Sequence, residues 1–349
     1  MTKSDSIFSE ENIQTNVLPL FHLDNSEVTQ VKFKNTIKQR AVYKINNSGK
    51  YYCLKKVYFN KEELLFIYSA LEWLYRCNIL VPKFLPSKNG LRYAEYNDML
   101  FILTYWVDGE KCDYDNLNHV IKSIDNLGKM HRVSKDFIPI SESKLLENHD
   151  SLYKSMTKHF FNLLESYNQA QYYKDKYSEF FLDNFEKNLF LAKSSMNISS
   201  SINNLNLTRS LCHLDYVNKN IIIDNNNKVN VIDFDKCRLD FVAHDLSYFF
   251  RRFLKRNGTN WNLEFTINLL NTYEKQNSLN IDDYKYILSY LSFPQKYWKL
   301  SKDYYNNIKR CNKYSFFNLL KASVKRDDLQ ILFVKGFKDH IETKFNEKI

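Results

Sequence analysis

The sequence predicts an α+β protein in which a small antiparallel sheet lobe precedes a large, mainly helical lobe. Two patterns predict this order. Apolar and polar side chains alternate as in strands from Val31 and again over 40–45, whereas the chain beyond residue 115 has helical spacing almost throughout. The 349 residues are 44% hydrophobic and 26% charged, so the chain is globular in composition and long enough to bury a substantial core.

The strands come first along the chain. Residues 1–27 are polar and mixed, and we expect them to form a loosely held lead-in. Alternation begins at Val31 and resumes over 40–45, and the turn at 46–49 then leads into a β-branched and aromatic strand at 51–57. Three antiparallel strands are therefore predicted.

A helix and a central strand complete the sheet lobe. Asn60 followed by Glu63 is a helix-start pattern in which the two side chains satisfy free backbone N–H groups. The apolar residues that follow share one helical face: Leu64, Ile67, Leu71 and Leu74. Residues 99–106 are apolar throughout, so we expect them to form a strand at the centre of the sheet.

The remaining chain is predominantly helical. Helical spacing covers residues 116–133, 142–168, 172–198, 242–256, 262–277, 282–291 and, in pieces, 302–346. Residues 211–235 interrupt it with two short strands, at 220–224 and 228–233, around an Asn-rich turn. We therefore place the sheet lobe at 28–105 and the helical lobe at 106–349.

Several classes of protein are excluded or not expected. Only 6 glycines occur, and neither G-x-G-x-x-G nor G-x-x-x-x-G-K-[ST] is present, which excludes the Rossmann and Walker nucleotide sites. No apolar run is long enough to span a membrane, and the N-terminus lacks an apolar signal segment, so we expect a cytoplasmic protein without membrane insertion. The six cysteines lack metal-like spacing and are expected to be core thiols in a reducing compartment.

The net charge of +10 is unevenly distributed, because residues 296–349 hold 13 Lys or Arg and 6 Asp or Glu. A basic segment of this kind attracts nucleic acid or other anions. We favour a solvated helical face for it and do not expect nucleic acid as a partner.

One group of polar residues is suited to catalysis. His213, Asp215 and Asn220 form the pattern H-x-D-x-x-x-x-N. Asp233 follows 18 residues after Asp215, at the end of an apolar strand. A phosphoryl-transfer site needs a carboxylate near the acceptor hydroxyl and oxygen ligands that hold Mg²⁺ against the nucleotide phosphates. Asp215 suits the first role, and Asn220 and Asp233 suit the second.

A strand lysine, Lys55, lies upstream and is followed by a helix with an early glutamate. This is the layout of the kinase lobes, in which the lysine holds the phosphates and a helix carboxylate anchors the lysine. The sequence resembles the kinase-like phosphotransferases of the aminoglycoside and choline kinase type and, more closely, the CotS family of bacterial spore coat proteins. The matching stretches, between residues 28 and 340, are 52–56, 64–72, 211–216, 231–235 with 244–246, and 293–298 with Tyr304 and Tyr305.

The resemblance implies a two-lobed protein-kinase-like fold of the aminoglycoside phosphotransferase type, with ATP and Mg²⁺ as cofactors. By position it makes Asp215 the catalytic-loop aspartate and Lys55 the nucleotide lysine. Asn220 and Asp233 become metal ligands. Asp235 resembles the second acid of an acidic pair that reaches a second Mg²⁺.

The resemblance also implies supporting residues. Glu63 is the expected helix partner of Lys55, with Glu62 as the alternative because both lie in the first turn. His213 and Asp245 are expected to hold the catalytic loop. We expect a further set of aromatic side chains to be core rather than the lining of an acceptor pocket: Tyr216, Tyr297, Trp298, Tyr304 and Tyr305.

One departure from the protein-kinase pattern matters. The first two strands are joined by residues 34–39 without glycine, although protein kinases cover the phosphates with a Gly-rich loop. The small-molecule kinase branch often lacks that loop, so its absence favours this branch or weakened nucleotide binding.

Two functions follow from these expectations. The first is an ATP- and Mg²⁺-dependent phosphotransferase that acts on a hydroxyl of an unknown acceptor, either a small molecule or a coat protein. The alternative is a catalytically inactive pseudokinase that serves, with other coat proteins, as a structural component of the spore coat. Both functions imply that the protein is made in the sporulating cell and is incorporated in the spore coat.

Overall fold

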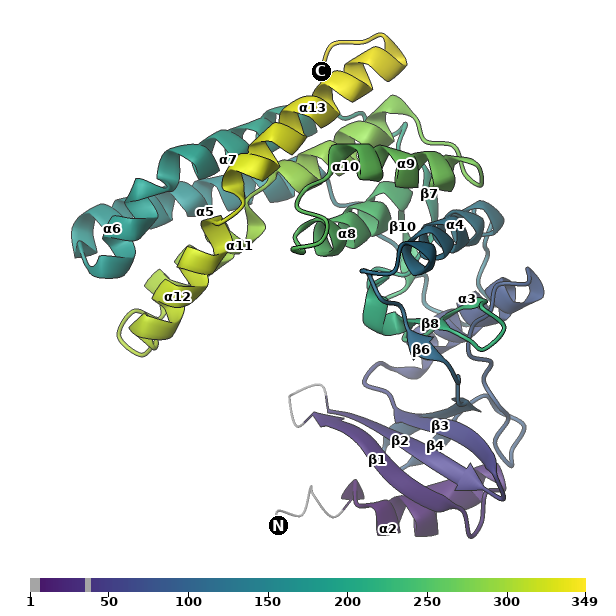
Figure 1. Ribbon diagram of the computed structural model, residues 1–349. Coiled ribbons are helices and arrows are strands. Elements are labelled where there is room, and N and C mark those ends of the chain that lie inside the picture. The colour runs from purple at the N-terminus through teal and green to yellow at the C-terminus, as the bar shows by residue number, and fades with distance from the viewer. Residues whose placement is uncertain (1–6, 35–38) are drawn as a thin grey trace. The chain divides into compact units, whose positions relative to one another are not determined.

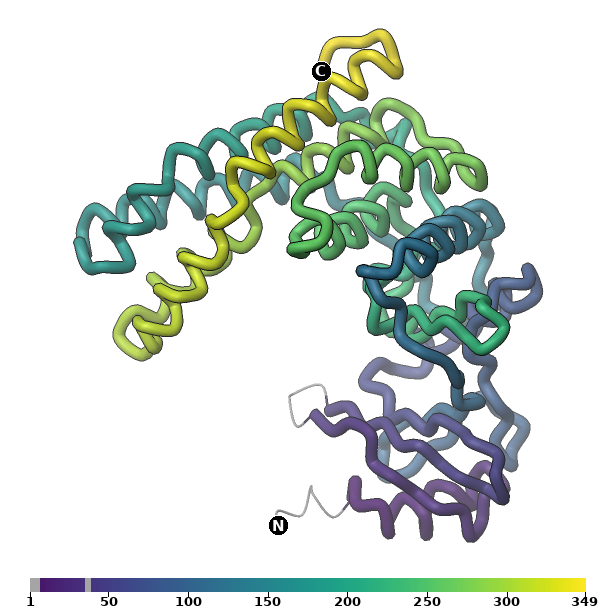
Figure 2. The backbone as a smooth tube through the Cα atoms, in the orientation of Figure 1, coloured from purple at the N-terminus to yellow at the C-terminus, as the bar shows by residue number. Residues whose placement is uncertain are grey.

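The computed structural model describes residues 7–34 and 39–349. The chain folds as two compact units: Met1–Glu147 with Asn218–Arg238 form unit 1, and Asn148–Val217 with Leu239–Ile349 form unit 2. These units differ from the expected division after residue 105, because a helix and a hairpin that follow the main sheet belong to unit 1. Figure 1 labels the helices and strands, and Figure 2 traces the backbone along the chain.

Unit 1 contains a five-stranded antiparallel sheet with the strand order β1-β2-β3-β5-β4. The strands are β1 (Glu27–Lys34), β2 (Arg40–Asn47), β3 (Lys50–Lys56), β4 (Ala94–Tyr96) and β5 (Met99–Tyr105). The pairing of the first three confirms the predicted antiparallel strands, and β5 lies inside the sheet between β3 and β4. Most of the loop at 34–39 lies outside the described residues.

Alternation along β2 separates a buried face of the sheet from a face that carries charge. Three alternate β2 side chains have no exposed surface: Ala41, Tyr43 and Ile45. Because successive side chains point to opposite faces, Val42 lies on the other face. Its register partners are Lys32 on β1 and Lys55 on β3, so the two lysines share that face.

The segment before β1 corrects one expectation, since it is not loosely held. It forms the short helices α2 (Glu10–Asn12), η1 (Ile13–Val17) and η2 (Leu18–Phe21). Their apolar residues join the buried cluster beneath the sheet: Phe8, Ile13, Val17, Leu18, Phe21 and Leu23. The Tyr43 hydroxyl donates to the Phe8 carbonyl over 2.8 Å, and burial raises the pKa of Tyr43 to about 12. Ile13, Val17 and Phe21 recur every four positions, and this helical spacing is the signal that polar composition obscured.

The rest of unit 1 consists of two helices and a small second sheet. Helix α3 (Lys61–Arg76) begins as predicted, because the Asn60 side chain accepts a hydrogen bond of 2.9 Å from the Glu63 N–H. Helix α4 spans Leu117–Val133. The second sheet has the order β6-β8-β9 and comprises β6 (Glu110–Lys111), β8 (Ile221–Ile223) and β9 (Val229–Val231), with the turn η3 (Asn218–Asn220) before β8. This hairpin confirms the two short strands predicted around the Asn-rich turn.

Unit 2 is mainly helical, as predicted. Its elements are α5 (Leu152–Tyr173), α6 (Lys176–Asp183), α7 (Phe185–Ser200), β7 (Arg209–Cys212), β10 (Arg238–Phe241), α8 (Val242–Leu254), α9 (Leu263–Glu274), α10 (Ile281–Ser292), α11 (Gln295–Asn306), α12 (Lys313–Val324) and α13 (Asp327–Phe345). The predicted helix at 142–168 begins ten residues later than expected, at Leu152. The predicted helix at 172–198 is divided at Asn184.

Helix α10 is the centre of unit 2. It packs against α7, α8 and α13, and all its residues from Asp282 to Ser292 are buried. The expected core role of the aromatic set is confirmed for Tyr216, Tyr297 and Tyr304, which are at most 2% exposed. Among the described helices, none has the length and apolar character that a bilayer crossing requires.

Candidate functional site

Lys55 forms the centre of the candidate site in unit 1. Its Nζ donates to Asp233 Oδ1 over 2.7 Å and to Asp235 Oδ1 over 2.5 Å. The three side chains are 15%, 28% and 7% exposed, so these ion pairs are largely removed from solvent. Burial opposes the charge on Lys55, but Asp235 and then Asp233 outweigh it and raise the pKa of the lysine above its ordinary value. The site therefore holds one cation between two carboxylates.

One oxygen of this group has no hydrogen bond. Asp235 Oδ2 is buried and has no hydrogen-bond partner among the described residues, and Arg40 Nη1 lies 3.8 Å from it. The Arg40 guanidinium is held over the Tyr58 ring at 4.1 Å. A buried carboxylate oxygen without a partner is costly, so this position favours a further cation.

The β8–β9 hairpin brings Asn220 and Asp233 to the same end of the second sheet. Ile221 pairs with Val231, and the Ile232 N–H donates to the Asn220 carbonyl over 2.9 Å. Asn220 is buried, and Asp233 has a left-handed backbone with a φ of 69°. Strained backbone of this kind occurs where a side chain must be aimed at a site. An amide and two carboxylates are thus available as oxygen ligands in unit 1.

Asp215 lies in unit 2, directly after β7, in a loop held by Asp245. The Asp245 carboxylate, in the first turn of α8, accepts from the N–H groups of His213 over 2.6 Å and Leu214 over 2.7 Å. The Asp215 N–H in turn donates to His213 Nδ1 over 3.1 Å. These contacts confirm the expected role of His213 and Asp245 in holding the loop. Asp215 itself is 8% exposed.

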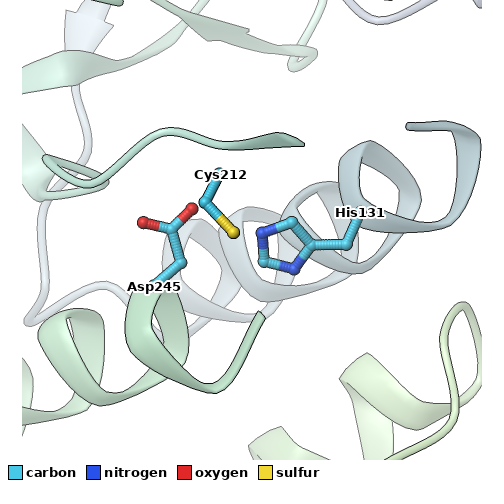
Figure 3. Close-up of side chains that lie close together, drawn as sticks. All are labelled: His131, Cys212 and Asp245. Carbon is cyan, nitrogen blue, oxygen red and sulfur yellow. The ribbon is translucent and has the colours of Figure 1, made fainter. Parts of the chain in front are cut away.

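Cys212 also lies beside the Asp245 carboxylate, within 4.8 Å of it (Figure 3, which also draws His131 of α4). Burial and then the charge of Asp245 raise the pKa of the Cys212 thiol well above its ordinary value. Cys212 has no exposed surface, so the expectation of a core thiol is confirmed at this position.

The structure pairs Glu63 with a different lysine from the one we expect. Glu63 Oε1 accepts from Lys144 Nζ over 2.9 Å, and the Lys144 N–H donates to the Glu62 carbonyl over 3.1 Å. Lys55 is bonded to the two aspartates instead, so neither Glu63 nor Glu62 is its partner in this structure. The reason is electrostatic, because two carboxylates from the hairpin attract Lys55 more strongly than one carboxylate from α3.

Sequence reasoning missed Arg40 and Lys32 as members of the charged face. Burial and Lys34 lower the pKa of Lys32, Lys219 and Lys55 add to that effect, and Asp233 opposes it. Lys32 and Lys55 are linked in register through Val42, so strand alternation is the signal that could have found Lys32. The face is therefore rich in cations, and a polyanion would be stabilised there.

The profile of the phosphotransferase enzyme family matches residues 33–277, which are 245 of the 349 residues. The chain belongs to the phosphotransferase enzyme family. The matched region contains Arg40 and the residues from Lys55 to Asp245, whereas Lys32 lies one residue before it.

Solved structures of related phosphotransferases share the fold. An aminoglycoside phosphotransferase from Alicyclobacillus acidocaldarius has a TM-score of 0.76 at 17% identity, with 89% of this chain and 95% of that chain covered. A spectinomycin phosphotransferase in complex with ADP and spectinomycin has a TM-score of 0.67 at 18% identity, with coverages of 94% and 98%. A microcompartment-associated aminopropanol kinase has a TM-score of 0.58 at 12% identity, also with coverages of 94% and 98%. These similarities confirm the predicted kinase-like fold of the aminoglycoside phosphotransferase type.

Proposed function

We propose that this phosphotransferase-family protein is an ATP- and Mg²⁺-dependent enzyme that transfers the γ-phosphoryl group of ATP to an alcohol hydroxyl. The observation that carries the proposal is the convergence of Asp233 and Asp235 on Lys55, at the end of the hairpin that also bears Asn220. A lysine, acidic side chains and an amide oxygen are the groups with which kinases hold a metal–nucleotide complex. The ADP-bound spectinomycin enzyme, which has the same fold, supports this use of the site.

The donor set fits a magnesium ion. Asp233 and Asp235 supply carboxylate oxygens, and Asn220 supplies an amide oxygen. Asp235 Oδ2, buried and without a hydrogen bond in the described part of the chain, is an oxygen that a cation would satisfy. Mg²⁺ takes oxygen ligands of these types. When bound, the ion would offset the negative charge of the phosphate oxygens.

The protein's own side chains have distinct proposed tasks. Lys55 binds phosphate oxygens of the nucleotide, with Arg40 adding positive charge beside it. Asp215 orients the acceptor hydroxyl and accepts its proton as the oxygen attacks the γ-phosphorus. When the nucleotide and metal are bound by the two aspartates, Glu63 or Glu62 forms the ion pair that holds Lys55 in place.

We propose a small hydroxyl compound, such as a sugar or an amino alcohol, as the acceptor. Spectinomycin and aminopropanol, named for two enzymes of this fold, are compounds of that class. The alternative acceptor is a hydroxyl on a spore coat protein. Only the resemblance to the CotS family supports this alternative.

An inactive pseudokinase of the spore coat is the second candidate, and one observation favours it. Lys55 occupies an oxygen of each aspartate that a metal would need. If these ion pairs persist with nucleotide present, the site is closed to cations and the fold serves packing between coat proteins.

Thermal unfolding with ATP and Mg²⁺ separates the two candidates. For an enzyme we expect stabilisation that disappears in Asp233→Ala and persists in the matched control Asp108→Ala, an exposed loop aspartate. No stabilisation at millimolar nucleotide would contradict the enzyme proposal. A second experiment follows the transfer of label from ATP to alcohols or to a sporulating-cell extract. If ATP stabilises wild type and Asp215→Ala equally and neither protein transfers label, the result would favour the pseudokinase.

A further inference from the structure

Unit 2 contains a pocket that the proposed reaction does not use. The pocket has a volume of about 120 Å³, well above the roughly 10–15 Å³ that a single water molecule requires. It lies where the turn after α8, the start of α11 and the start of α13 meet. Its lining includes Lys255, Lys296, Arg326, Asp327, Trp261 and Asn188. A space of this size accommodates a small polyatomic ion.

The charges that line the pocket are mainly positive. Three cations, Lys255, Lys296 and Arg326, face one carboxylate, Asp327, whose Oδ2 accepts from Asn188 Nδ2 over 2.7 Å. Among the described residues, the side-chain ammonium groups of Lys255 and Lys296 have no hydrogen-bond or ion-pair partner, although the Lys255 carbonyl accepts from Arg326. Burial lowers the pKa of Lys255 to about 8, and Arg251 and Lys296 contribute to the decrease. A partly buried ammonium such as that of Lys255, placed among like charges, is stabilised by an anion.

Arg326 fixes the shape of the pocket. Its Nε donates to Asn260 Oδ1 over 2.9 Å, its Nη1 donates to the Lys255 carbonyl over 2.9 Å, and its Nη2 donates to Asn257 Oδ1. The arginine thus ties the start of α13 to the turn that carries Lys255. Its hydrogen bonds are used within the protein, whereas those of the two lysines are available to a ligand.

A second observation concerns Asn188, which is fully buried at the pocket. Its Oδ1 has no donor among the described residues, although its Nδ2 is bonded to Asp327. A buried acceptor without a donor is expected to be satisfied by a bound molecule. The ligand should therefore carry negative oxygens together with one O–H group.

We propose that this pocket binds hydrogen phosphate, either as the free ion or as the end of a phosphorylated small molecule. Three cations against one carboxylate leave a net charge that matches a doubly charged anion, and the O–H of hydrogen phosphate meets the requirement at Asn188. Phosphate at this position links α8, α11 and α13, so it stabilises the helical unit independently of the nucleotide.

Isothermal titration of the full-length protein with inorganic phosphate at neutral pH and constant ionic strength tests the site. Wild type should bind saturably, and Lys255→Met and Lys296→Met should each weaken binding about tenfold or more, because each removes a charge-assisted hydrogen bond. The control Lys299→Met, an exposed lysine on the same helix as Lys296, should leave the affinity unchanged. Lys55→Met should also leave it unchanged, since the proposed phosphate does not occupy the nucleotide site.

Several outcomes would overturn the proposal: no saturable binding at millimolar phosphate, loss of binding in Lys55→Met, or equal weakening in Lys299→Met. Sulfate lacks the O–H group and should bind more weakly than phosphate. Equal affinities for the two anions would show that Asn188 does not accept a hydrogen bond from the ligand. Titration with glycerol 3-phosphate distinguishes the sources, because tighter binding than inorganic phosphate identifies a phosphorylated compound. Lys296 lies at the exposed rim, so its variant provides the test if Lys255→Met does not fold.

Discussion

Asp245 accepts a 2.7 Å hydrogen bond from the backbone N–H of Leu214, a leucine whose φ is 56°. A left-handed backbone costs a residue with a Cβ about 1–2 kcal/mol. The charge-assisted hydrogen bonds from Leu214 and His213 to one buried carboxylate offset that cost. Asp245 thereby fixes the loop from which Asp215 projects.

Replacement of Asp245 tests this arrangement. We expect Asp245→Ala to lower the free energy of unfolding by about 3 kcal/mol, because two backbone N–H groups lose a charged acceptor. Asp245→Asn retains one acceptor oxygen and should recover part of the loss. Urea unfolding measures both, with the exposed Asp339→Ala on α13 as the control, expected to change stability by less than about 0.5 kcal/mol. A cost of Asp245→Ala no larger than that of the control would contradict the role assigned to Asp245.

Removal of the cation at Lys55 should give a pH-dependent loss of stability. In Lys55→Met the carboxylates of Asp233 and Asp235 lose the lysine between them and keep only the more distant Arg40, 3.8 Å from Asp235 Oδ2, so the pKa of one of them rises. The folded variant then binds a proton that the unfolded chain releases, and its stability increases as the pH falls. We expect a deficit of about 2–3 kcal/mol near pH 8 that shrinks towards pH 5 in urea unfolding. The exposed Lys50→Met should show neither effect, and a deficit that does not vary with pH would argue against the coupling.

Gly109 should be the least replaceable of the described glycines with a positive φ. Its φ is 140°, and a Cβ there would lie 2.3 Å from the Ile223 carbonyl oxygen on β8. Backbone cannot move aside as a side chain can, so we expect Gly109→Ala to cost about 3 kcal/mol or more in thermal or urea unfolding. Gly90 has a φ of 74° with no atom within 4 Å of a Cβ, and Gly90→Ala should cost only about 1 kcal/mol. Similar costs for the two variants would show that strain, and not the contact with Ile223, dominates.

The buried carboxyl of Asp327 should lower the free energy of unfolding of unit 2 once it is ionised. Burial raises the pKa of this carboxyl to about 6, although the hydrogen bond from Asn188 opposes the rise. Between about pH 4 and pH 6 the folded protein binds more protons than the unfolded chain, so this group's contribution falls as the pH rises. Asp327→Asn should therefore be more stable than wild type near pH 7, by up to about 3 kcal/mol, and equally stable below pH 4. Asp339→Asn, at an exposed position of α13, is the control, and a constant difference between Asp327→Asn and wild type across this pH range would refute the assignment.

The parts of the fold that could be predicted depend on local signals. The Asn60 cap, the alternation along β2 and the spacing from His213 to Asp233 each lie within a short stretch of chain, so residue type and periodicity suffice to interpret them. The same holds for Asp245, whose place follows from a motif.

The parts that could not be predicted depend on contacts between distant segments. Lys55 and Asp233 are 178 residues apart in sequence, and which carboxylate the lysine selects depends on the local field and not on any motif. The polar composition before β1 likewise gave no indication that Phe8 would meet Tyr43. The pocket at Lys255 involves the turn after α8 and residues of α7, α11, α12 and α13, whose meeting point no periodicity specifies.

Both units are discontinuous in the chain, because residues 148–217 separate the two parts of unit 1. On the ribosome, the sheet that carries Lys55 therefore emerges well before the hairpin that carries its aspartate partners. Until β8 has been synthesised, β6 has no strand to pair with, and until Asp235 has followed, the charge of Lys55 lacks its carboxylate partners. A fragment that ends at Glu147 should consequently be poorly folded, and truncation is an unsuitable route to the isolated sheet of unit 1.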